Sequence, residues 1–332
     1  MKKHLISRLG YLGVALSILC TGCANSDSDN GGAAEKQNVS IGVAQIVDHT
    51  SLNMIRDAFK EEMIALGYPE SGMDFQNASN DVSNLNSIMQ KFNGDNKDII
   101  VAIATPTAQA AANYASERPV VFSAVSDPIK AGLLTSMDKP DKGITGTSDE
   151  IQVDQILDLA LAIHPDLKTL GFLYNPGEAN SVSNLEKVKA YCEEKNIALI
   201  ESAVTGISDV QTNTQVLLTK VDAVFVPNDN TVASAMSALA AEARKAKVPV
   251  YVGADSMVID GGFATVGIDY AQLGRETARM TDAILSGKKP EELPVAVFKT
   301  DLKIYINEKV MQELGITLPD DIKNSEQLQL IQ

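Results

Sequence analysis

Apolar runs alternate with stretches of helical periodicity through most of the chain, from residue 39 onward. The largely apolar run at 39–47 predicts a strand, and the spacing of Met54, Ala58 and Phe59 predicts a helix over 51–66. The same reasoning predicts further strands over residues 73–77, 99–104, 120–125, 169–174, 198–204, 223–226 and 249–252. Further helices are predicted over residues 81–92, 106–115, 152–162, 181–195, 210–220 and 231–247.

Strands this apolar, each followed by a helix, are typical of parallel sheets that are covered by helices on both faces. Residues 99–115 and 223–240 share one layout, in which a strand, a polar turn and an alanine-rich helix follow one another. We therefore predict an α/β fold of two Rossmann-like lobes with parallel sheets and a ligand cleft between the lobes. Residues 264–269 add a strand, 270–285 a helix, 295–306 an extended stretch and 307–314 a helix.

The first 22 residues have the features of an export signal. Three basic residues lie among the first eight, and the apolar stretch 9–19 is too short to cross the ~30 Å core of a bilayer. The small residues Thr21 and Gly22 precede Cys23, as in a bacterial lipoprotein signal. We predict that residues 1–22 are removed and that Cys23 is lipidated. The alternatives are modification at Cys20, and a plain cleaved signal that leaves Cys23 as a free thiol.

Two acyl chains on Cys23 would hold the protein durably on a membrane. Residues 23–37 are polar and show no periodicity, so we expect a flexible tether. Cys192 would then be the one unmodified cysteine of the mature chain, which excludes an intramolecular disulfide. The predicted location is extracytoplasmic, with a lipid anchor in the bacterial cell membrane.

Composition narrows the function further. The 332 residues carry 28 Lys and Arg against 43 Asp and Glu, a net charge of −15 that disfavours a nucleic-acid partner. With three His and three Cys, a His/Cys metal centre is not expected. The lack of Trp disfavours a sugar cleft floored by aromatic rings. Neither phosphate-binding glycine motif is present, so no cofactor is predicted.

Small polar and acidic residues follow the carboxyl ends of the predicted strands, where parallel α/β sheets bind ligands. These turns contain no Lys or Arg. The predicted helix starts at Thr105 and Asn230 favour an anion, and Asp127, Asp229 and Asp255 could meet an ammonium group. The pattern suits a zwitterion, although each of these residues could equally serve only to cap a helix or form a turn.

A catalytic site is not expected. His49 could act as a general base, but no Ser or Cys stands in a recognisable nucleophile elbow, so a polar cleft or surface position fits it better. His164 follows a predicted helix and suits a C-terminal cap. Tyr270 and the other large aromatics at strand and helix positions are expected mainly in the core. We therefore predict a protein that is not an enzyme.

The sequence resembles the lipoprotein substrate-binding components of ABC importers related to the tryptophan/tyrosine-binding group. The resemblance covers about residues 39–318, and its segments occur in the same order as in that family. They are IGVAQIVDHTSLNMIRDAFKEEMIALGY (41–68), AIATPTAQAAAN (102–113), VVFSAVSDPIKAGL (120–133), GITGTSD (143–149), LGFLYNPGEANSV (170–182), VDAVFVPNDNTVASA (221–235) and VGIDYAQLGRETARMTDAILSGKKP (266–290).

This resemblance implies a type I periplasmic-binding-protein architecture. Lobe 1 would comprise residues 38–145 plus about 267–288, and lobe 2 residues 146–266 plus about 289–332. The implied ligand is an aromatic amino acid, Trp, Tyr or Phe. The implied ligand-binding residues are Gln45, Thr105, Thr107, Ser126, Asp127, Asn175, Asn180, Asp229, Asn230 and Asp255.

The resulting hypothesis is a monomeric, lipid-anchored receptor that delivers an amino acid to an ABC permease and its ATPase. The same role with a branched-chain amino acid or a nucleoside as cargo is one alternative. A surface sensor or adhesin on the same fold is another. A surface hydrolase that uses cleft carboxylates is the enzymatic alternative.

Overall fold

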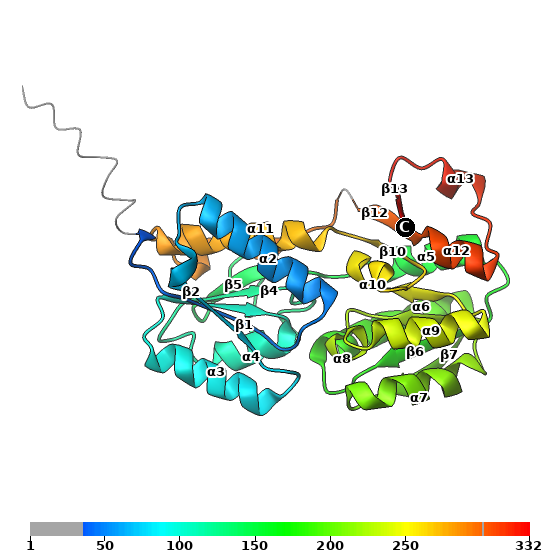
Figure 1. The fold of residues 1–332 in the computed structure, drawn as a ribbon, viewed down its shortest axis with the longest axis horizontal. Coiled ribbons are helices and arrows are strands. Elements are labelled where there is room, and N and C mark those ends of the chain that lie inside the picture. Colours follow the sequence, from blue (N-terminus) through cyan, green and yellow to red (C-terminus); the bar gives the residue numbers. More distant parts are fainter. Residues whose placement is uncertain (1–35, 301) are drawn as a thin grey trace, which may run out of the picture.

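The computed structural model describes residues 36–300 and 302–332. The chain forms two lobes that lie side by side, each with a sheet between layers of helices (Figure 1). The prediction of two α/β lobes with parallel sheets is confirmed. The predicted signal, the modified Cys23 and most of the tether lie outside the described residues.

Lobe 1 contains a six-stranded parallel sheet in the order β11-β5-β4-β3-β1-β2. Its strands are β1 (Ile41–Gln45), β2 (Met73–Asn77), β3 (Ile99–Ile103), β4 (Val120–Ser123), β5 (Ile144–Ser148) and β11 (Ala296–Val297). Its helices are α2 (Thr50–Ala65), α3 (Val82–Gly94), α4 (Thr105–Ala112) and α11 (Tyr270–Leu285). The helices α2 and α11 cover one face of the sheet, and α3 and α4 cover the other (Figure 1).

Lobe 2 contains a seven-stranded sheet in the order β13-β12-β10-β9-β8-β6-β7, in which only the β10–β12 pair is antiparallel. Its strands are β6 (Thr169–Tyr174), β7 (Ala198–Ala203), β8 (Ala223–Val226), β9 (Val250–Val252), β10 (Ala264–Gly267), β12 (Lys303–Asn307) and β13 (Leu328–Ile331). Its helices are α5 (Val153–Ile163), α6 (Ala179–Lys195), α7 (Ile207–Leu218), α8 (Asn230–Ala233), α9 (Met236–Ala246), α10 (Asp255–Ile259), α12 (Glu308–Leu314) and α13 (Asp320–Lys323).

Burial of apolar side chains explains why these elements form. All five residues of β1 and of β3 are buried, as expected for central strands with helices on both faces. In α2 the buried residues Leu52, Ile55 and Phe59 recur at helical spacing and face the lobe 1 core. Each lobe therefore has the packing needed to hold its strand ends in fixed positions.

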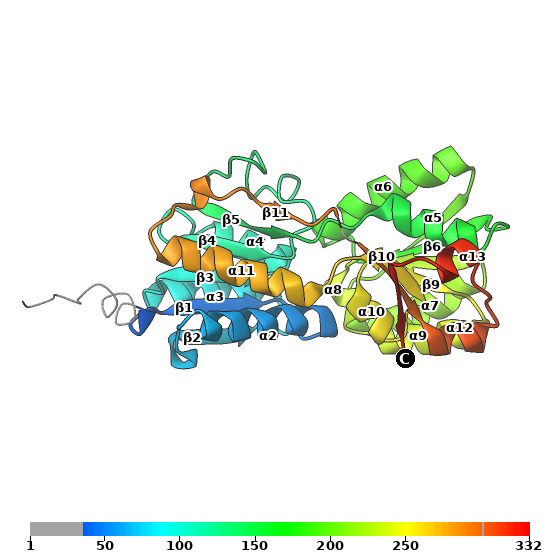
Figure 2. The ribbon, with the colours of Figure 1, turned by 90° about the horizontal axis from the view of Figure 1, so that it is seen from above.

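The chain passes between the lobes at three places: after β5, between β10 and α11, and between β11 and β12. Figure 2, which views the molecule from above, shows these segments running from one lobe to the other. Because the backbone joins the lobes at three connections, any change in the angle between the lobes has to bend the chain at all three. Within the described residues, no helix has the length and apolarity required to cross a bilayer.

Several elements differ from those expected from the sequence. The strand β5 is not predicted, because its sequence ITGTS is polar, yet all five residues are buried. Thr145 donates a hydrogen bond to the Leu293 carbonyl oxygen, and the hydroxyl of Thr147 lies 3.0 Å from that of Thr277. Side-chain hydrogen bonds to residues distant in sequence thus replace apolar burial in this strand.

Other differences concern the late part of the chain. The single helix expected over 231–247 is divided into α8 and α9, and the extended stretch 295–306 forms two strands in different lobes. Residues 289–297 are expected in lobe 2, but β11 pairs with β5 in lobe 1. The short elements α10, α13 and β13 have too few residues to show a periodicity.

The packing of α11 on α2 generates a prediction. A Cβ atom at Gly274 would overlap the carbonyl oxygen of Ile55 and lie 3.1 Å from Cβ of Ala58. We expect Gly274→Ala to lower the free energy of unfolding by about 2 kcal/mol, because the two helices must move apart. Gly94→Ala is the matched control, since nothing lies within 4 Å of its Cβ position. Chemical denaturation measures both, and equal stability of the two variants would contradict this close packing.

Candidate functional site

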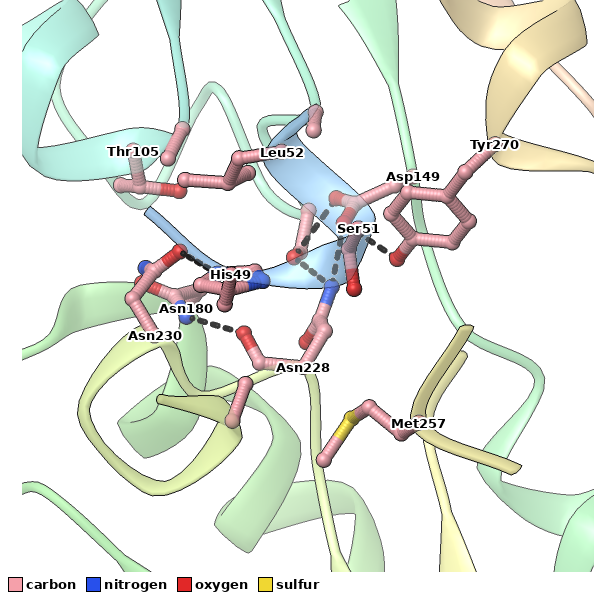
Figure 3. Close-up of a pocket in the computed structure, with 14 residues that line it drawn as sticks. His49, Ser51, Leu52, Thr105, Asp149, Asn180, Asn228, Asn230, Met257 and Tyr270 are labelled. Carbon is pink, nitrogen blue, oxygen red and sulfur yellow. Dashed lines mark hydrogen bonds between the residues drawn. The ribbon is translucent and has the colours of Figure 1, made fainter. Parts of the chain in front are cut away.

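A cavity lies between the two lobes (Figure 3). Its lining comes from residues that follow the carboxyl ends of strands in both sheets. This is the edge at which parallel α/β sheets place their ligands.

Lobe 1 supplies the lining from the segments after β1, β3, β4 and β5. They contribute His49, Ser51, Leu52, Ala104, Thr105, Ala124, Ser126 and Asp149. The segments after β6, β8, β9 and β10 contribute Asn180, Asn228, Asn230, Ala233, Met257 and Tyr270. Among the described residues, no Lys or Arg lines this cavity.

Two alanines at the cavity have strained backbone. Ala104 has φ of 79° and Ala124 has φ of 56°, both in the left-handed region that favours glycine. A non-glycine residue in that region costs about 1–3 kcal/mol, and such residues cluster at functional sites. Here the strain occurs where β3 and β4 end and turn into the cavity wall, which marks these strand ends as the functional edge of the sheet.

Asp149 is a buried carboxylate with uncharged partners. It accepts hydrogen bonds from the hydroxyls of Ser126 and Tyr270, both at 2.9 Å, and from Nδ2 of Asn228 at 2.6 Å. Burial raises the pKa of this carboxyl group, and the three donors oppose that rise. No basic side chain of the described residues pairs with Asp149. The cavity therefore holds a carboxylate that lacks a counter-charge.

Other polar atoms of the lining have no partner. Oγ1 of Thr105, Oδ1 of Asn180 and Nδ1 of His49 are buried and make no hydrogen bond within the described residues. An unpaired buried polar atom costs about 1–3 kcal/mol. A bound molecule with matching donors and acceptors would remove that cost.

Two helices begin at the cavity with uncapped amino ends. Neither α2 nor α4 has a side-chain cap, and neither carries an acidic residue in its first turn. The free N–H groups and the helix dipole favour an anion at such a position. The lining thus offers an acidic group and two sites for an anion, which together suit a zwitterion.

The lobes also contact each other directly around the cavity. His49 lies 3.2 Å from Oδ1 of Asn230, and Oγ of Ser51 lies 2.5 Å from Oγ of Ser256. Thr50 donates to Asp260 at 2.8 Å. All three contacts join the start of α2 in lobe 1 to lobe 2, so the structure has a closed arrangement.

Four of the ten residues expected to bind a ligand line this cavity: Thr105, Ser126, Asn180 and Asn230. Asp229 instead caps α8, where it accepts from the backbone N–H of Val232, and it also accepts from Ser181 and the N–H of Asn175. Asp127 accepts from Ser183 of the opposite lobe, outside the cavity lining.

The remaining four expected residues also lie outside the lining. The side chain of Asn175 bonds to Thr231 and to the N–H of Gly177, so it shapes a turn. Thr107 is buried within α4. Gln45 donates to Asp48 and Asn53, and Asp255 accepts from the N–H of Ser256 at the start of α10. Burial raises the pKa of Asp255 to about 7.

Sequence reasoning missed Asp149, Asn228 and Tyr270 as lining residues. Tyr270 is expected in the core, and its ring is indeed buried, but its hydroxyl reaches Asp149. Asp149 follows the strand β5, which the sequence does not predict, so the sequence does not reveal that this residue lies at the carboxyl end of a strand. His49 lies in the cavity wall, which agrees with the cleft position considered for it.

Comparison with known proteins places the fold and site in context. The family model described as ABC transporter substrate binding protein matches residues 40–328. The tyrosine-binding protein of Clostridioides difficile is 34% identical over 315 residues, which cover 92% of this chain and 90% of that protein. The uncharacterized protein RP367 of Rickettsia prowazekii is 23% identical over 247 residues, covering 74% and 77% of the two chains.

Two solved structures bear on the closed arrangement. The ABC domain from Streptococcus pneumonia in complex with L-Trp is 37% identical and superposes with a TM-score of 0.84, covering 88% of this chain and all of that one. The ligand-free, open structure of CD0873 from Clostridium difficile, a substrate binding protein with adhesive properties, is 35% identical and covers 89% and 99% of the two chains. Its TM-score is lower, 0.66, at nearly equal identity.

The structure thus resembles the ligand-bound relative more than the open one, in agreement with the contacts between its lobes. The family match spans most of the chain, and the tyrosine-binding and Trp-bound relatives are covered over 90% or more of their length. The family resemblance inferred from the sequence is confirmed: the chain belongs to the ABC transporter substrate binding protein family.

Proposed function

We propose that this extracytoplasmic substrate-binding protein captures an aromatic amino acid in the cavity between its lobes and delivers it to an ABC permease driven by an ATPase. The observation that carries the proposal is the unpaired carboxylate of Asp149 in a cavity that also contains two uncapped helix starts. The Trp-bound and tyrosine-binding relatives support the same ligand class.

The ammonium group of the ligand is assigned to Asp149. In the closed cavity a carboxylate without a counter-charge is costly, and an ammonium group provides that charge. Oδ1 of Asn180 is a second acceptor, because its Nδ2 already donates to the carbonyl oxygen of Asn228 at 2.9 Å. The amine site therefore differs from the one expected from the sequence, which used Asp127 and Asp229.

The carboxylate of the ligand is assigned to the starts of α2 and α4. The hydroxyl of Thr105 is available there as a hydrogen-bond donor, and the first-turn N–H groups of both helices are uncapped. Charge-assisted hydrogen bonds of this kind are about twice as strong as neutral ones.

The apolar side chain of the ligand is assigned to the part of the lining formed by Leu52, Ala104, Ala124, Ala233 and Met257. These side chains are apolar, and a methionine thioether makes favourable contacts with aromatic groups. In this proposal the protein binds and releases its ligand without chemical change.

Anchoring through Cys23 is the second part of the proposal. The family is extracytoplasmic, and Cys23, which follows a stretch with the features of a lipoprotein signal, stands 18 residues before the start of β1 at Ile41. The short polar tether would keep the receptor near its permease. A role in adhesion is a further candidate, supported by the adhesive properties named for the 35% identical CD0873.

Ligand identity can be tested by thermal unfolding in the presence of single candidate ligands. We expect L-Trp, L-Tyr or L-Phe to raise the melting temperature of residues 24–332 by roughly 5 °C or more at 100 times the dissociation constant. Branched-chain amino acids and nucleosides are the comparison set. A shift only with that set would contradict the aromatic assignment.

The amine site predicts the behaviour of Asp149→Asn. We expect the affinity for the amino acid to fall about 10- to 100-fold, because the charge opposite the ammonium group is lost. The free protein should become no less stable at pH 8, since a carboxyl group with a raised pKa destabilises the fold once it ionises. Titration calorimetry measures the first effect and thermal unfolding the second.

Asp57→Asn is the control for this measurement, because Asp57 is exposed on α2 and pairs with Arg56. Its affinity should match that of the wild type. If Asp149→Asn and Asp57→Asn bound the amino acid equally well, the amine site would be elsewhere.

For the anchor, we expect full-length Cys23→Ala to lose incorporation of labelled palmitate and to leave the membrane fraction. Cys20→Ala is the matched control and should retain both. The two acyl chains account for the difference, since each buried CH₂ contributes about 0.8 kcal/mol to membrane binding. Loss of labelling in Cys20→Ala alone would move the modification to Cys20.

A further inference from the structure

The imidazole of His49 reaches across the boundary between the lobes. His49 precedes α2 in lobe 1, and its Nε2 lies 3.2 Å from Oδ1 of Asn230 at the start of α8 in lobe 2 (Figure 3). Both residues line the cavity. Which atom of this pair carries the hydrogen is fixed by the groups behind Asn230.

Glu178 determines the orientation of the Asn230 amide. Its carboxylate accepts from Nδ2 of Asn230 at 2.6 Å and from the backbone N–H of Asn230 at 3.0 Å. It also accepts from the N–H of Thr231 at 3.0 Å and from the Thr231 hydroxyl at 2.9 Å. The Glu178 oxygens act as acceptors in all of these bonds, so they would repel the amide oxygen of Asn230. Nδ2 of Asn230 must therefore point toward Glu178, and Oδ1 toward His49.

An amide oxygen can only accept, so Nε2 of His49 must be the donor in this pair. The ring is then either the neutral Nε2–H tautomer or the imidazolium. Burial lowers the pKa of His49 to about 4, against the opposing effects of Asn230 and Asp48, so the ring is neutral at pH 7. In the closed protein Nδ1 therefore carries a lone pair and no hydrogen.

This lone pair has no partner among the described residues. Nδ1 of His49 is buried and makes no hydrogen bond, and the side chain does not cap the N–H groups of α2. It belongs to the same cavity lining as the carboxylate of Asp149 and the free Oδ1 of Asn180. These three groups can accept a hydrogen bond but cannot donate one, and an ammonium group has three hydrogens to donate.

We propose that Nδ1 of His49 accepts a hydrogen bond from the ammonium group of the bound amino acid, while Nε2–H holds lobe 2 closed through Asn230. This inference rests on the proposed function, because it assigns a third acceptor to the same amine. It makes His49 a ligand-binding residue and a closure contact at once, so protonation of the ring removes the acceptor needed by the ligand.

The charged groups around His49 define the expected pH dependence. Asp48 adjoins it in sequence, Glu178 and Asp229 lie behind Asn230 in lobe 2, and Asp149 is in the cavity wall. When the lobes open, the ring enters water and its pKa returns to about 6.5. Because the closed-state pKa is depressed, closure is fully favoured above pH 6.5 and is lost as the pH falls toward 4.

The first experiment determines the tautomer in the wild-type protein. The chain from residue 24 contains two histidines, His49 and His164, so ¹⁵N-histidine labelling gives two ring spectra, and His49→Gln identifies one by its loss. With saturating L-Phe at pH 7.5, we expect the His49 ring to show a protonated Nε2 and an unprotonated Nδ1. A protonated Nδ1 in the complex would overturn the proposal, whatever the variants do.

The second experiment measures the dissociation constant of L-Phe and L-Trp between pH 8 and pH 5. For the wild type, the pKa of His49 is about 4 in the closed protein and about 6.5 in water. This difference predicts a dissociation constant about 30-fold higher at pH 5 than at pH 8. His49→Asn and His49→Gln are the matched variants, since neither amide titrates in this range. Between pH 8 and pH 5 the dissociation constant of the wild type should rise about 30-fold more than the dissociation constants of the two variants. Titration of Asp149 and Asp255 affects all three proteins alike, so this difference reports on His49 alone.

The two variants also differ from each other. The amide oxygen of His49→Asn can occupy the Nδ1 position, whereas His49→Gln can replace only Nε2–H. At pH 8 we expect His49→Gln to bind about 10- to 100-fold more weakly than the wild type and His49→Asn to recover much of the loss. The loss should be equal for L-Phe and L-Trp, because both carry the ammonium group.

A loss confined to L-Trp would place the contact on the indole N–H and overturn the amine assignment. The amine assignment would also be overturned if the affinity of the wild type depended on pH no more strongly than the affinities of the two variants. If the wild type bound no aromatic amino acid at pH 8, the proposed function itself would fail and this contact with it. Binding of L-Phe with a protonated Nδ1 would contradict only the role of His49.

Discussion

The site depends on one buried carboxylate and on the three uncharged groups that hold it. Asp149 lies where the chain first leaves lobe 1, and its donors come from the end of β4, from the turn after β8 and from the start of α11. These donors belong to both lobes and to a second connection between them. Hydrogen bonds orient the carboxylate but leave its charge without a partner. In the function proposed above, the cost of that charge favours a cationic group in the closed cavity, and hence a ligand with an amine.

Closure follows from the same geometry. Strand ends from both sheets meet at the cavity, and α2 bonds directly to lobe 2 through the residues next to His49. These contacts can form only when the lobes approach each other, and His49, Ser51 and Asn230 also line the cavity. The lower structural similarity to the open relative than to the Trp-bound one agrees with this closed arrangement. Since the chain crosses between the lobes three times, any opening has to bend the backbone at all three connections.

The sequence predicted most of the fold, because strands buried on both faces are nearly continuous apolar runs. The strand β5 was the informative exception: its Thr and Ser side chains are satisfied by Leu293 and Thr277, partners that no local pattern reveals. Because β5 was not predicted, the cavity residue that follows it, Asp149, was not predicted either. The residues expected at strand ends include Thr105 and Asn180, which line the cavity, but a position at a strand end does not separate lining residues from helix caps. Asp229 shows why, since an acid before a helix has the same sequence pattern in either role.

The central claim is that an amino acid lies in this cavity with its ammonium group on Asp149 and its carboxylate at the starts of α2 and α4. A crystal structure of the mature chain with L-Trp or L-Tyr tests it most directly. The account predicts the ligand nitrogen about 2.7–3.0 Å from an Asp149 oxygen, as in charge-assisted hydrogen bonds. A ligand bound in the opposite orientation, or outside the boundary between the lobes, would contradict it.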